Sequence, residues 1–311
     1  MGKGRGFGKV ILFNEHFVVY NIPSIVSAIA QTTTATVEQF EGKGVRLEDL
    51  RPATPRYKKE KIDQQRGSVD IILEAVGVDP SRSPIKITLK GDLVAASGIG
   101  ASAASCVAIA RAVSDEFGLH LSDERINDIA FEGERAYHGT PSGVDNTAAT
   151  YGGLIWFVRD KPNVIERIEV REPIEIVMGN TGKVADTVAV VDGVRERKEK
   201  HSEKYTKIFM EAEELAYDAK RALENFDLEK VGKLMDDNHR LLQEIEVSSK
   251  ELDFLVELVR DHGAFGAKLT GGGCGGNMVA LTPGKDLQEK VANAIEREGF
   301  AALRTKVGVK A

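Results

Sequence analysis

The chain has 311 residues, 42% of them apolar, which is long enough for two ordinary domains that each bury a core. Its formal net charge is −6, with 42 Lys and Arg interspersed among 48 Asp and Glu, which excludes a basic face that would gather nucleic acid or anionic lipid. No apolar run of about 18 residues occurs, and the two cysteines suggest neither a disulfide framework nor a metal site, so we expect a cytoplasmic protein without a membrane partner.

Short β-branched runs at the start of the chain predict strands. VILF begins at Val10, FVVY at Phe17 and TTTATVE at Thr32, and polar, glycine or proline breaks separate them. Residues 41–67 are polar and predict a variable connection that leads into a helix, whose apolar stripe runs from Val69 to Val76.

A strand and two helices are predicted in the middle of the chain. Apolar and polar residues alternate from Ile85 to Leu89, as in a strand, and the chain then enters the small-residue segment SGIGASAAS, residues 97–105. The helix after it has a plausible end at Gly118. Ser122 can cap the next helix, which runs to about His138.

Strands return in LIWFV, from Leu154, and IEIVM, from Ile174, and the Pro162-Asn163 break between them is the expected domain boundary. From about Glu203 to His262 the pattern is amphipathic helix in three pieces, broken near Asn225 and Val247, and Ser248 with Glu251 predicts a capping box. A strand at VALT, a helix over about residues 285–298 and a strand at LRTKVGV complete an α+β pattern.

Two glycine-rich segments indicate close approach of the backbone, in the first to a ligand and in the second to a ligand or another loop. In SGIGASAAS, Gly98 and Gly100 precede a helix whose unpaired N–H groups and positive dipole end suit a polyphosphate, although a tight turn into a packed helix is equally compatible. TGGGCGGN, Thr270–Asn277, has five glycines in six residues, and its strand-like flanks favour a backbone constraint over a flexible surface loop.

Two further segments carry charged side chains that phosphoryl transfer could use. In EGERAYHGTPSGVDN, Glu134 could hold Mg²⁺ and Asp145 could orient a hydroxyl, or the two could be a solvated helix residue and a cap. In GKVILFNEHFVVY, Lys9 could neutralise phosphate charge, lower the pKa of a carboxylate, or simply be solvated at a strand end. Glu15 with His16 could bind a polar substrate or simply occupy a turn.

These four segments, in this order, resemble the motifs of the galactokinase, homoserine kinase, mevalonate kinase and phosphomevalonate kinase superfamily over nearly the whole chain. GKVILFNEHFVVYNIPSIV is similar to the first motif in its mevalonate kinase form, SGIGASAAS to the phosphate-cradling motif and AKLTGGGCGGN to the third. HGTPSGVDNTAATYGG is similar to the mevalonate kinase segment with the catalytic aspartate. The compact length is similar to that of archaeal mevalonate kinases.

The resemblance implies a two-domain α/β (α+β) small-molecule kinase fold with the active site in the inter-domain cleft. An N-terminal nucleotide-binding domain would cover residues 1–165, and a C-terminal α+β sandwich domain would cover residues 166–311. The resemblance also implies ATP and Mg²⁺ as cofactors, and a homodimer would be in keeping with family members.

The resemblance assigns catalytic roles to single residues. Asp145 would be the base, or the orienting carboxylate, for the substrate hydroxyl, and Lys9 beside it would lower its pKa and stabilise the transferred charge. Ser102 and Glu134 would hold Mg²⁺.

Ligand contacts follow from the same resemblance. Mevalonate would contact Glu15, His16 and Thr187. The ATP triphosphate would be wrapped by a continuous stretch of small residues: Val94, Ala95, Ala96, Ser97, Gly98, Ile99, Gly100, Ala101, Ser102, Ala103 and Ala104.

The sequence departs from the family pattern at five positions. Asn14 and Asn21 stand where glycine is usual, and asparagine tolerates a left-handed backbone better than most residues, so we expect the turns to be preserved. Val94 stands in place of proline, Ala96 in place of glycine and Ala101 in place of serine. These three changes fall in the segment expected to bind phosphate.

The implied activity is ATP-dependent phosphorylation of mevalonate to 5-phosphomevalonate in isoprenoid biosynthesis. The alternatives are a sister kinase acting on phosphomevalonate, homoserine or a sugar, and a non-catalytic relative that binds a nucleotide or metabolite. A galactokinase would normally have an aspartate where Val18-Val19 stand, and a phosphomevalonate enzyme would need further cationic contacts. Lys9, Glu134 and Asp145 are all present, which favours an enzyme.

Overall fold

The computed structural model describes residues 1–54, 57–95, 98–139, 141–183 and 187–310. The described chain forms two compact units. The first consists mainly of Met1–Lys9 and Ala28–Gly152, and the second of Val10–Ser27 and Gly153–Val309. No helix in these described ranges combines the length and the apolar composition needed to cross a membrane.

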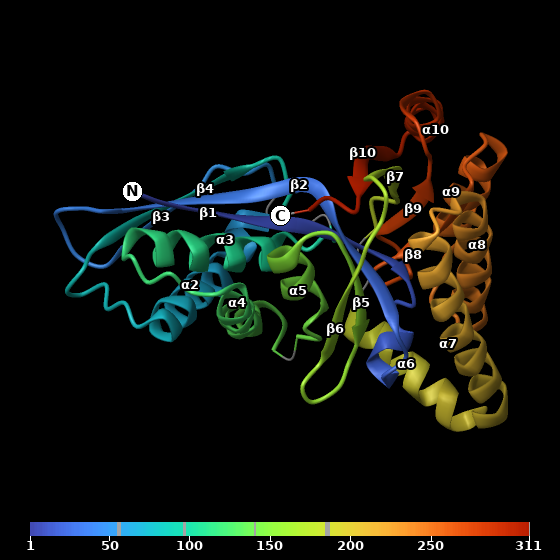
Figure 1. Ribbon diagram of the computed structural model, residues 1–311, viewed down its shortest axis with the longest axis horizontal. Coiled ribbons are helices and arrows are strands. Elements are labelled where there is room, and N and C mark those ends of the chain that lie inside the picture. Colours follow the sequence, from blue (N-terminus) through green and yellow to red (C-terminus); the bar gives the residue numbers. More distant parts are fainter. Residues whose placement is uncertain (55–56, 96–97, 140, 184–186, 311) are drawn as a thin grey trace. The chain divides into compact units, whose positions relative to one another are not determined.

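The first unit is a mixed sheet with helices on one face (Figure 1). Its strands are β1 (Gly2–Phe13), β2 (Ser24–Gln39), β3 (Val45–Asp49) and β4 (Ile85–Gly91). The last residues of β1, from Val10, and the first residues of β2, up to Ser27, belong to the second unit. The four strands follow the order β3-β4-β2-β1, with β3 and β4 parallel and β2 and β4 antiparallel. The helices are α1 (Tyr57–Glu60), α2 (Ile62–Val76), α3 (Ala101–Glu116), α4 (Asp123–His138) and α5 (Val144–Tyr151).

Glycines at alternate positions of β1 let α3 pack directly on the sheet. Alternate strand residues face the same side, and alanines four apart lie on one face of a helix. A Cβ atom on Gly4 would lie 2.1 Å from the carbonyl oxygen of Ala108, and one on Gly6 would lie 2.3 Å from that of Ala104. The sequence GKGRGFG therefore fixes the position of α3, which begins at the small-residue segment.

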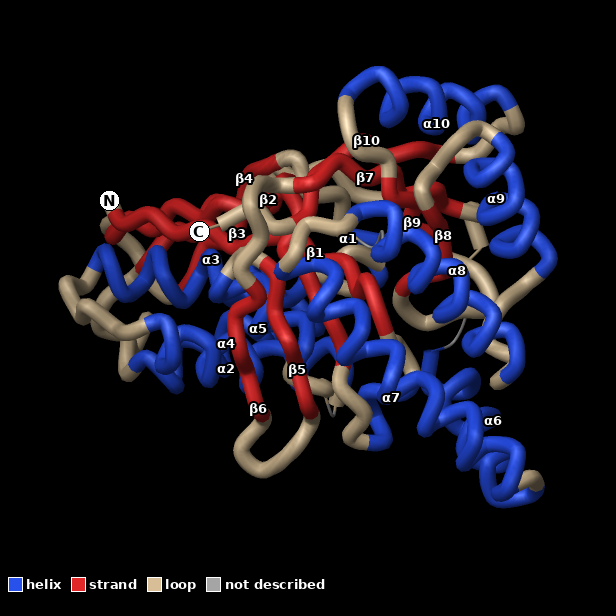
Figure 2. Tube along the Cα trace, turned by 45° about the vertical axis from the view of Figure 1, so that its right-hand side comes forward, coloured by secondary structure: helices blue, strands red, loops and turns tan. Residues whose placement is uncertain are grey.

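The second unit has an antiparallel sheet in the order β10-β7-β9-β8. These strands are β7 (Ile174–Asn180), β8 (Gly266–Thr270), β9 (Asn277–Leu281) and β10 (Ala301–Val307). A hairpin of β5 (Leu154–Val158) and β6 (Val164–Ile168) pairs with the first residues of β2 (Figure 2). The helices are η1 (Phe17–Tyr20), α6 (Thr187–Lys200), α7 (Ser202–Glu224), α8 (Leu228–Glu244), α9 (Lys250–Asp261) and α10 (Lys285–Arg297).

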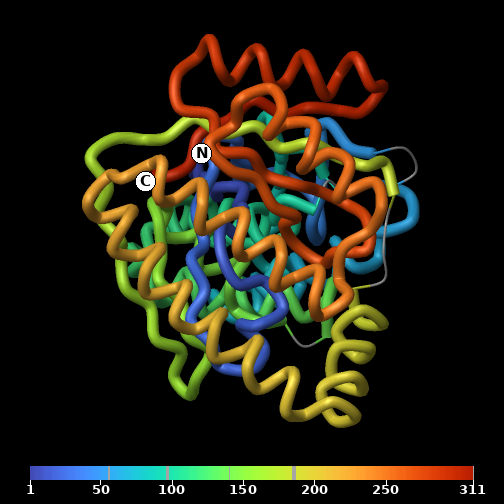
Figure 3. The backbone as a smooth tube through the Cα atoms, turned by 90° about the vertical axis from the view of Figure 1, so that its right-hand side faces the viewer, coloured from blue at the N-terminus to red at the C-terminus, as the bar shows by residue number. Residues whose placement is uncertain are grey.

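The long helical stretch predicted from the pattern is confirmed. Helices α7, α8 and α9 break near Asn225 and Val247, and α7 and α8, yellow and orange in Figure 3, run side by side. The Ser122 cap is also confirmed, since its side chain accepts a hydrogen bond from the N–H of Arg125 at 3.3 Å. The amphipathic period and the cap chemistry were sufficient to place these helices.

Three local predictions were wrong. FVVY forms the 3₁₀ helix η1 and not a strand, because residues with positive φ stand on both sides of it and turn the chain. Residues 41–67 contain strand β3. Because β3 is half exposed and mostly polar, its alternation of apolar and polar residues is hard to recognise in the sequence. Ser248 does not cap α9: Ser249 accepts from the N–H of Leu252, while the hydroxyl of Ser248 donates to Asp253.

The compact units do not have the bounds predicted for the domains. The Pro162-Asn163 break lies in the turn between β5 and β6, within the second unit, and the units separate between Gly152 and Gly153. Residues 10–27 belong to the second unit. The assignment of nucleotide binding to residues 1–165 and of an α+β sandwich domain to residues 166–311 stays a prediction.

Candidate active site

Lys9 and Asp145 form an ion pair in the first unit. Lys9 lies on β1 with 7% of its surface exposed, and its Nζ is 3.0 Å from Oδ1 of Asp145. Asp145 stands in the first turn of α5, after Gly143, which adopts a left-handed φ of 88°. The Asp145 side chain is 31% exposed, so the carboxylate is held by the lysine while remaining open to a ligand.

Glu134, on α4, is buried next to this pair. Burial is the main cause that raises the pKa of Glu134 to about 8, and the negative charge of Asp145 raises it further. A hydrogen bond from Ser102 and the positive charge of Lys9 act in the opposite direction and lower this pKa. Within the described part of the chain, Oε1 of Glu134 is buried without a hydrogen-bond partner. A buried carboxylate beside a second carboxylate and a hydroxyl is a set of hard oxygen ligands, which fits Mg²⁺.

The described residues contain no group of three or more His, Cys, Asp or Glu placed to hold a metal ion. Mg²⁺ usually takes only one or two protein groups, its other ligands being water and phosphate oxygens. Ser102 and Glu134 therefore fit the expected ion as a pair and not as a complete cage.

The segment predicted to wrap the triphosphate leads into α3. Gly98 and Gly100 have φ values of 75° and 76°, and the backbone N–H of Lys9 donates to the carbonyl oxygen of Ile99 at 2.9 Å. Among the described residues no side chain caps α3 at Gly100, so the first N–H groups of the helix can bind an anion. Two members of the predicted set, Ala96 and Ser97, lie outside the described residues.

Gly100 is required for the approach of this segment to Lys9. A Cβ atom at position 100 would lie 2.8 Å from Cγ of Lys9. The described part of the segment thus brings Lys9, the start of α3 and Ser102 together, and its role in phosphate binding stays a prediction. In this unit the residues proposed for catalysis and for the metal ion form one cluster.

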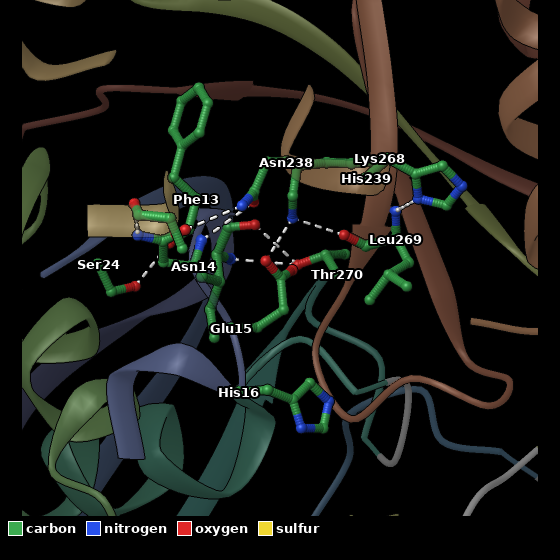
Figure 4. Close-up of polar contacts among 12 residues, drawn as sticks. Phe13, Asn14, Glu15, His16, Ser24, Asn238, His239, Lys268, Leu269 and Thr270 are labelled. Carbon is green, nitrogen blue, oxygen red and sulfur yellow. Dashed lines mark hydrogen bonds and ion pairs between the residues drawn. The ribbon is translucent and has the colours of Figure 1, made fainter. Parts of the chain in front are cut away.

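In the second unit, Glu15 forms an ion pair with Lys268 of β8 (Figure 4). Lys268 is fully buried and also donates to the carbonyl oxygen of Leu269 at 2.6 Å. Burial lowers the pKa of Lys268, and the Glu15 carboxylate opposes that effect. A buried charge is tolerated only with such partners, so Lys268 fixes the Glu15 carboxylate in the turn.

The backbone of this turn is held by buried polar side chains. The N–H of Asn14 donates to Oδ1 of Asn238 at 3.1 Å, and Nδ2 of Asn238 donates to Oδ1 of Asn14 at 2.8 Å. Oγ1 of Thr270 donates to the carbonyl oxygen of Ile11 at 2.9 Å. Asn14 has φ 68° and Asn21 has φ 64°, which confirms that asparagine preserves left-handed turns at both positions.

His16 faces the glycine cluster. Its Nε2 is 3.0 Å from the carbonyl oxygen of Gly272, which can only accept, so Nε2 carries the proton. Burial is the main cause that lowers the pKa of His16 to about 4, and Nδ1 is buried without a hydrogen-bond partner in the described ranges. His16 is therefore a neutral imidazole with an acceptor nitrogen available.

Thr187, at the start of α6, approaches the same glycine cluster. A Cβ atom on Gly272 would lie 2.5 Å from Oγ1 of Thr187, and one on Gly273 would lie 2.2 Å from the carbonyl oxygen of Val247. The predicted backbone constraint in the cluster is thus confirmed, since other segments of the chain contact it closely. Thr187 and His16 both lie beside Gly272, and their contact with a substrate stays a prediction.

Sequence reasoning missed Lys268 and Asn238 as members of this second cluster. Lys268 was counted only as part of a strand-like flank, and Asn238 only as part of an amphipathic helix. A lysine within a strand beside a glycine cluster is a signal that could have been used, because an unpaired lysine is almost never fully buried. For Asn238 the sequence offers no comparable signal.

Comparison with known proteins identifies the family. Residues 64–153 match the family model of the GHMP kinases N terminal domain, and residues 219–302 match that of GHMP kinases C terminal. The mevalonate kinase of Pyrococcus furiosus is 35% identical over 96% of this chain and 94% of its own length. The mevalonate kinase of Aeropyrum pernix is 32% identical over 97% and 96%.

The fold agrees with the same group of proteins. The crystal structure of L. major mevalonate kinase in complex with R-mevalonate superposes with a TM-score of 0.94 at 39% sequence identity, covering 100% of this chain and 97% of that one. The α/β fold with helices on one face of the first-unit sheet is thus the fold of these two-domain kinases. On this identity over nearly its full length, the chain belongs to the mevalonate kinases of the GHMP kinase family.

Proposed function

We propose that this protein transfers the γ-phosphoryl group of ATP to the 5-hydroxyl of mevalonate, giving 5-phosphomevalonate for isoprenoid biosynthesis. The observation that carries the proposal is the close structural match, at 39% identity, to a relative solved with R-mevalonate. The clustering of Lys9, Asp145, Glu134 and Ser102 in the first unit supports it, because these are the groups that such a transfer needs.

Asp145 and Lys9 would carry the reaction. The exposed part of the Asp145 carboxylate accepts a hydrogen bond from the alcohol, whose oxygen forms a bond to the γ-phosphorus as the bond to the β,γ-bridging oxygen breaks. ADP leaves with that electron pair, and the alcohol proton passes to Asp145. Lys9, 3.0 Å from Asp145, holds the carboxylate in place and stabilises the negative charge on the transferred group.

Mg²⁺ is part of the proposal, with Ser102 and Glu134 as its protein ligands. The unpartnered buried oxygen of Glu134 supports this assignment, because a cation would supply the missing partner. When bound, the ion neutralises phosphate charge. The protein itself contributes the position of Ser102, set by the first turn of α3, and of Glu134, set by α4.

The remaining contacts belong to the same proposal. Glu15, His16 and Thr187 would contact mevalonate, and the available Nδ1 of His16 suits a substrate hydroxyl as donor. The segment from Val94 to Ala104 would wrap the triphosphate of ATP. Its glycines with positive φ and its uncapped helix start support that role.

The rival readings fit less well. A phosphomevalonate kinase must bind a second phosphate, and Lys268, beside the Glu15-His16 turn, does not offer a charge for it, because it is fully buried and already paired with Glu15. A non-catalytic relative could lose the catalytic groups without penalty, yet Lys9, Glu134 and Asp145 are present and assembled.

An ADP-release assay with a panel of acceptors tests the proposal. With ATP and magnesium, mevalonate should stimulate ADP release, while phosphomevalonate, homoserine and galactose should not. Preferential turnover of another acceptor would replace mevalonate by a sister substrate. ATP binding without turnover of any of the four would favour the non-catalytic relative.

Two broader properties complete the proposal. A cytoplasmic location is proposed from the absence of an apolar run of about 18 residues in the sequence, and cell fractionation tests it. A homodimer is in keeping with the family, and light scattering on the purified protein tests it. A mass corresponding to a single 33.8 kDa chain would exclude the dimer.

A further inference from the structure

Arg51 is a buried arginine in the segment for which the sequence predicted only a variable connection. It follows strand β3 and is 4% exposed. Its Nε and Nη2 donate to the two carboxylate oxygens of Asp49 at 3.0 and 2.7 Å, which is the paired geometry that arginine makes with a carboxylate. The carboxylate of Asp49, two residues earlier in the chain, thereby neutralises the positive charge of Arg51.

The remaining nitrogen of the guanidinium reaches the start of α3. The two protons of Nη1 are shared among three acceptors: the carbonyl oxygen of Ala101 at 3.1 Å, Oγ1 of Thr33 at 3.3 Å, and Oγ of Ser105. Ser105 donates its own proton to the carbonyl oxygen of Ala101 at 2.8 Å, so its oxygen is free to accept from the arginine. Arg51 thus ties the first turn of α3 to strand β2 and to the end of β3.

Asp49 is itself held from two other directions. Nε2 of Gln65, on α2, donates to its carboxylate at 2.8 Å, and Nζ of Lys58 donates to its carbonyl oxygen at 2.6 Å. Burial acts to raise the pKa of Asp49, but the hydrogen bonds and charge of Arg51 outweigh it and lower that pKa. The pair therefore stays ionised, and the guanidinium has a fixed anchor.

We propose that Arg51 is a positioning residue for ATP, because it fixes the first turn of α3 before the nucleotide binds. This rests on the proposed function, in which that turn receives the triphosphate and the next residue, Ser102, helps to hold the metal ion. If the turn is already ordered before ATP binds, none of the binding free energy of ATP is used to order it. Arg51 acts through Ala101 and Ser105, and its contribution belongs to nucleotide binding and not to the mevalonate side.

The alternative is that Arg51 only stabilises the fold, and variants can separate the two roles. Arg51→Met removes the paired arginine from the Asp49 carboxylate and leaves it with Gln65 and the more distant Lys58, 3.8 Å away, which lowers stability whatever the function. In the double variant Asp49→Leu/Arg51→Met both charges are replaced by apolar groups of similar size, which commonly restores stability. The hydrogen bonds to Ala101 and Ser105 remain absent in both variants.

Arg111 provides a matched control on the same helix. It also joins α3 to other elements, donating to the carbonyl oxygens of Arg5 and Thr150, each at 2.8 Å, and pairing with Asp123. It lies ten residues beyond Ala101, about 15 Å along the helix axis at 1.5 Å per residue. Arg111→Met should lower the melting temperature without changing ATP affinity.

The experiment measures the melting temperature, the Kd of ATP in the presence of magnesium by calorimetry, and the KM for mevalonate. We expect Arg51→Met to raise the Kd of ATP by about tenfold, with a KM for mevalonate near that of the unmodified protein. The double variant should regain the melting temperature and keep the weakened ATP affinity. Where Arg51→Met does not fold, Arg51→Lys, which keeps the charge but loses the paired geometry, is measured against the same criteria.

The inference would be overturned if the double variant regained ATP affinity together with its melting temperature. Unchanged ATP affinity in the Arg51 single variants would also overturn it, as would an equal loss of ATP affinity in Arg111→Met. Absence of ATP binding by the unmodified protein would overturn it as well. If the unmodified protein binds ATP and the Arg51 variants weaken that binding, but mevalonate is not phosphorylated, the proposed function fails while the role of Arg51 stands.

Discussion

Asp145 is the residue whose removal should affect the reaction most. Asp145→Asn keeps the shape of the side chain but removes the charge that orients the alcohol, so turnover should fall by roughly 10³-fold. The Kd of ATP should change little, because the start of α3 is untouched. Steady-state kinetics and calorimetry on the purified variant measure the two effects.

An exposed aspartate on α4, Asp128, provides the control for this prediction. Asp128→Asn makes the same chemical change away from the cluster and should leave turnover unchanged. Near-normal turnover in a folded Asp145→Asn protein would remove Asp145 from the mechanism.

His16 should make stability depend on pH. Burial lowers its pKa from 6.5 to about 4, so between these values the unfolded chain binds a proton that the folded protein does not. The stabilisation, on the order of 3 kcal/mol, is complete above pH 6.5 and is lost as the pH falls through this window towards 4. His16→Asn removes the titration and suits the φ of 63°, since asparagine tolerates positive φ.

Urea unfolding at several pH values measures this effect. The free energy of unfolding should depend less on pH between 6.5 and 4 in His16→Asn than in the unmodified protein. His120→Asn is the matched control, because His120 also has a positive φ, 49°, but is exposed and should be solvated in both states. Parallel pH profiles for the unmodified protein and His16→Asn would contradict the prediction.

At the scale of elements, Gly100 joins the phosphate-binding segment to strand β1. Gly100→Ala would strain a residue with φ 76° and would also place a Cβ atom 2.8 Å from Cγ of Lys9. Because Lys9 must shift, kcat/KM should fall roughly tenfold or more. Gly118→Ala has a similar strain, at φ 60°, with open space around the new atom, so it should lose stability without losing activity. Equal kcat/KM in the two variants would show that the contact with Lys9 is unimportant.

The elements that the sequence predicts well are those whose pattern is local. The apolar period of α7 to α9 and the Ser122 cap are properties of neighbouring residues, and both were confirmed. Strand β3 was missed because it is half exposed and depends on its pairing with β4. The helix η1 was missed because its β-branched composition favours a strand, and the positive φ values around it prevent one.

The candidate site shows the same limit. Lys9, Glu134 and Asp145 were each ambiguous alone, and only the order of four motifs made them a hypothesis about one site. The Glu15–Lys268 pair joins residues 253 apart, and no local pattern predicts such a partner. Arg51 was hidden in a polar segment, because its role depends on α3, which begins fifty residues later at Ala101.

At the scale of the whole molecule, each compact unit holds one part of the proposed chemistry. The first unit assembles Lys9, Ser102, Glu134 and Asp145, the groups for phosphoryl transfer. The second contains the Glu15-His16 turn, with Lys268 beneath it, proposed for substrate recognition. Similarity to mevalonate kinases covers both units, with 96% of the chain aligned to the Pyrococcus furiosus enzyme.

The most direct test is a crystal structure with a non-hydrolysable ATP analogue, magnesium and mevalonate. We expect the terminal phosphate beside Lys9 and the first turn of α3, with the mevalonate hydroxyl between that phosphate and the Asp145 carboxylate. A terminal phosphate bound away from Asp145, with no room for an alcohol between them, would contradict the account.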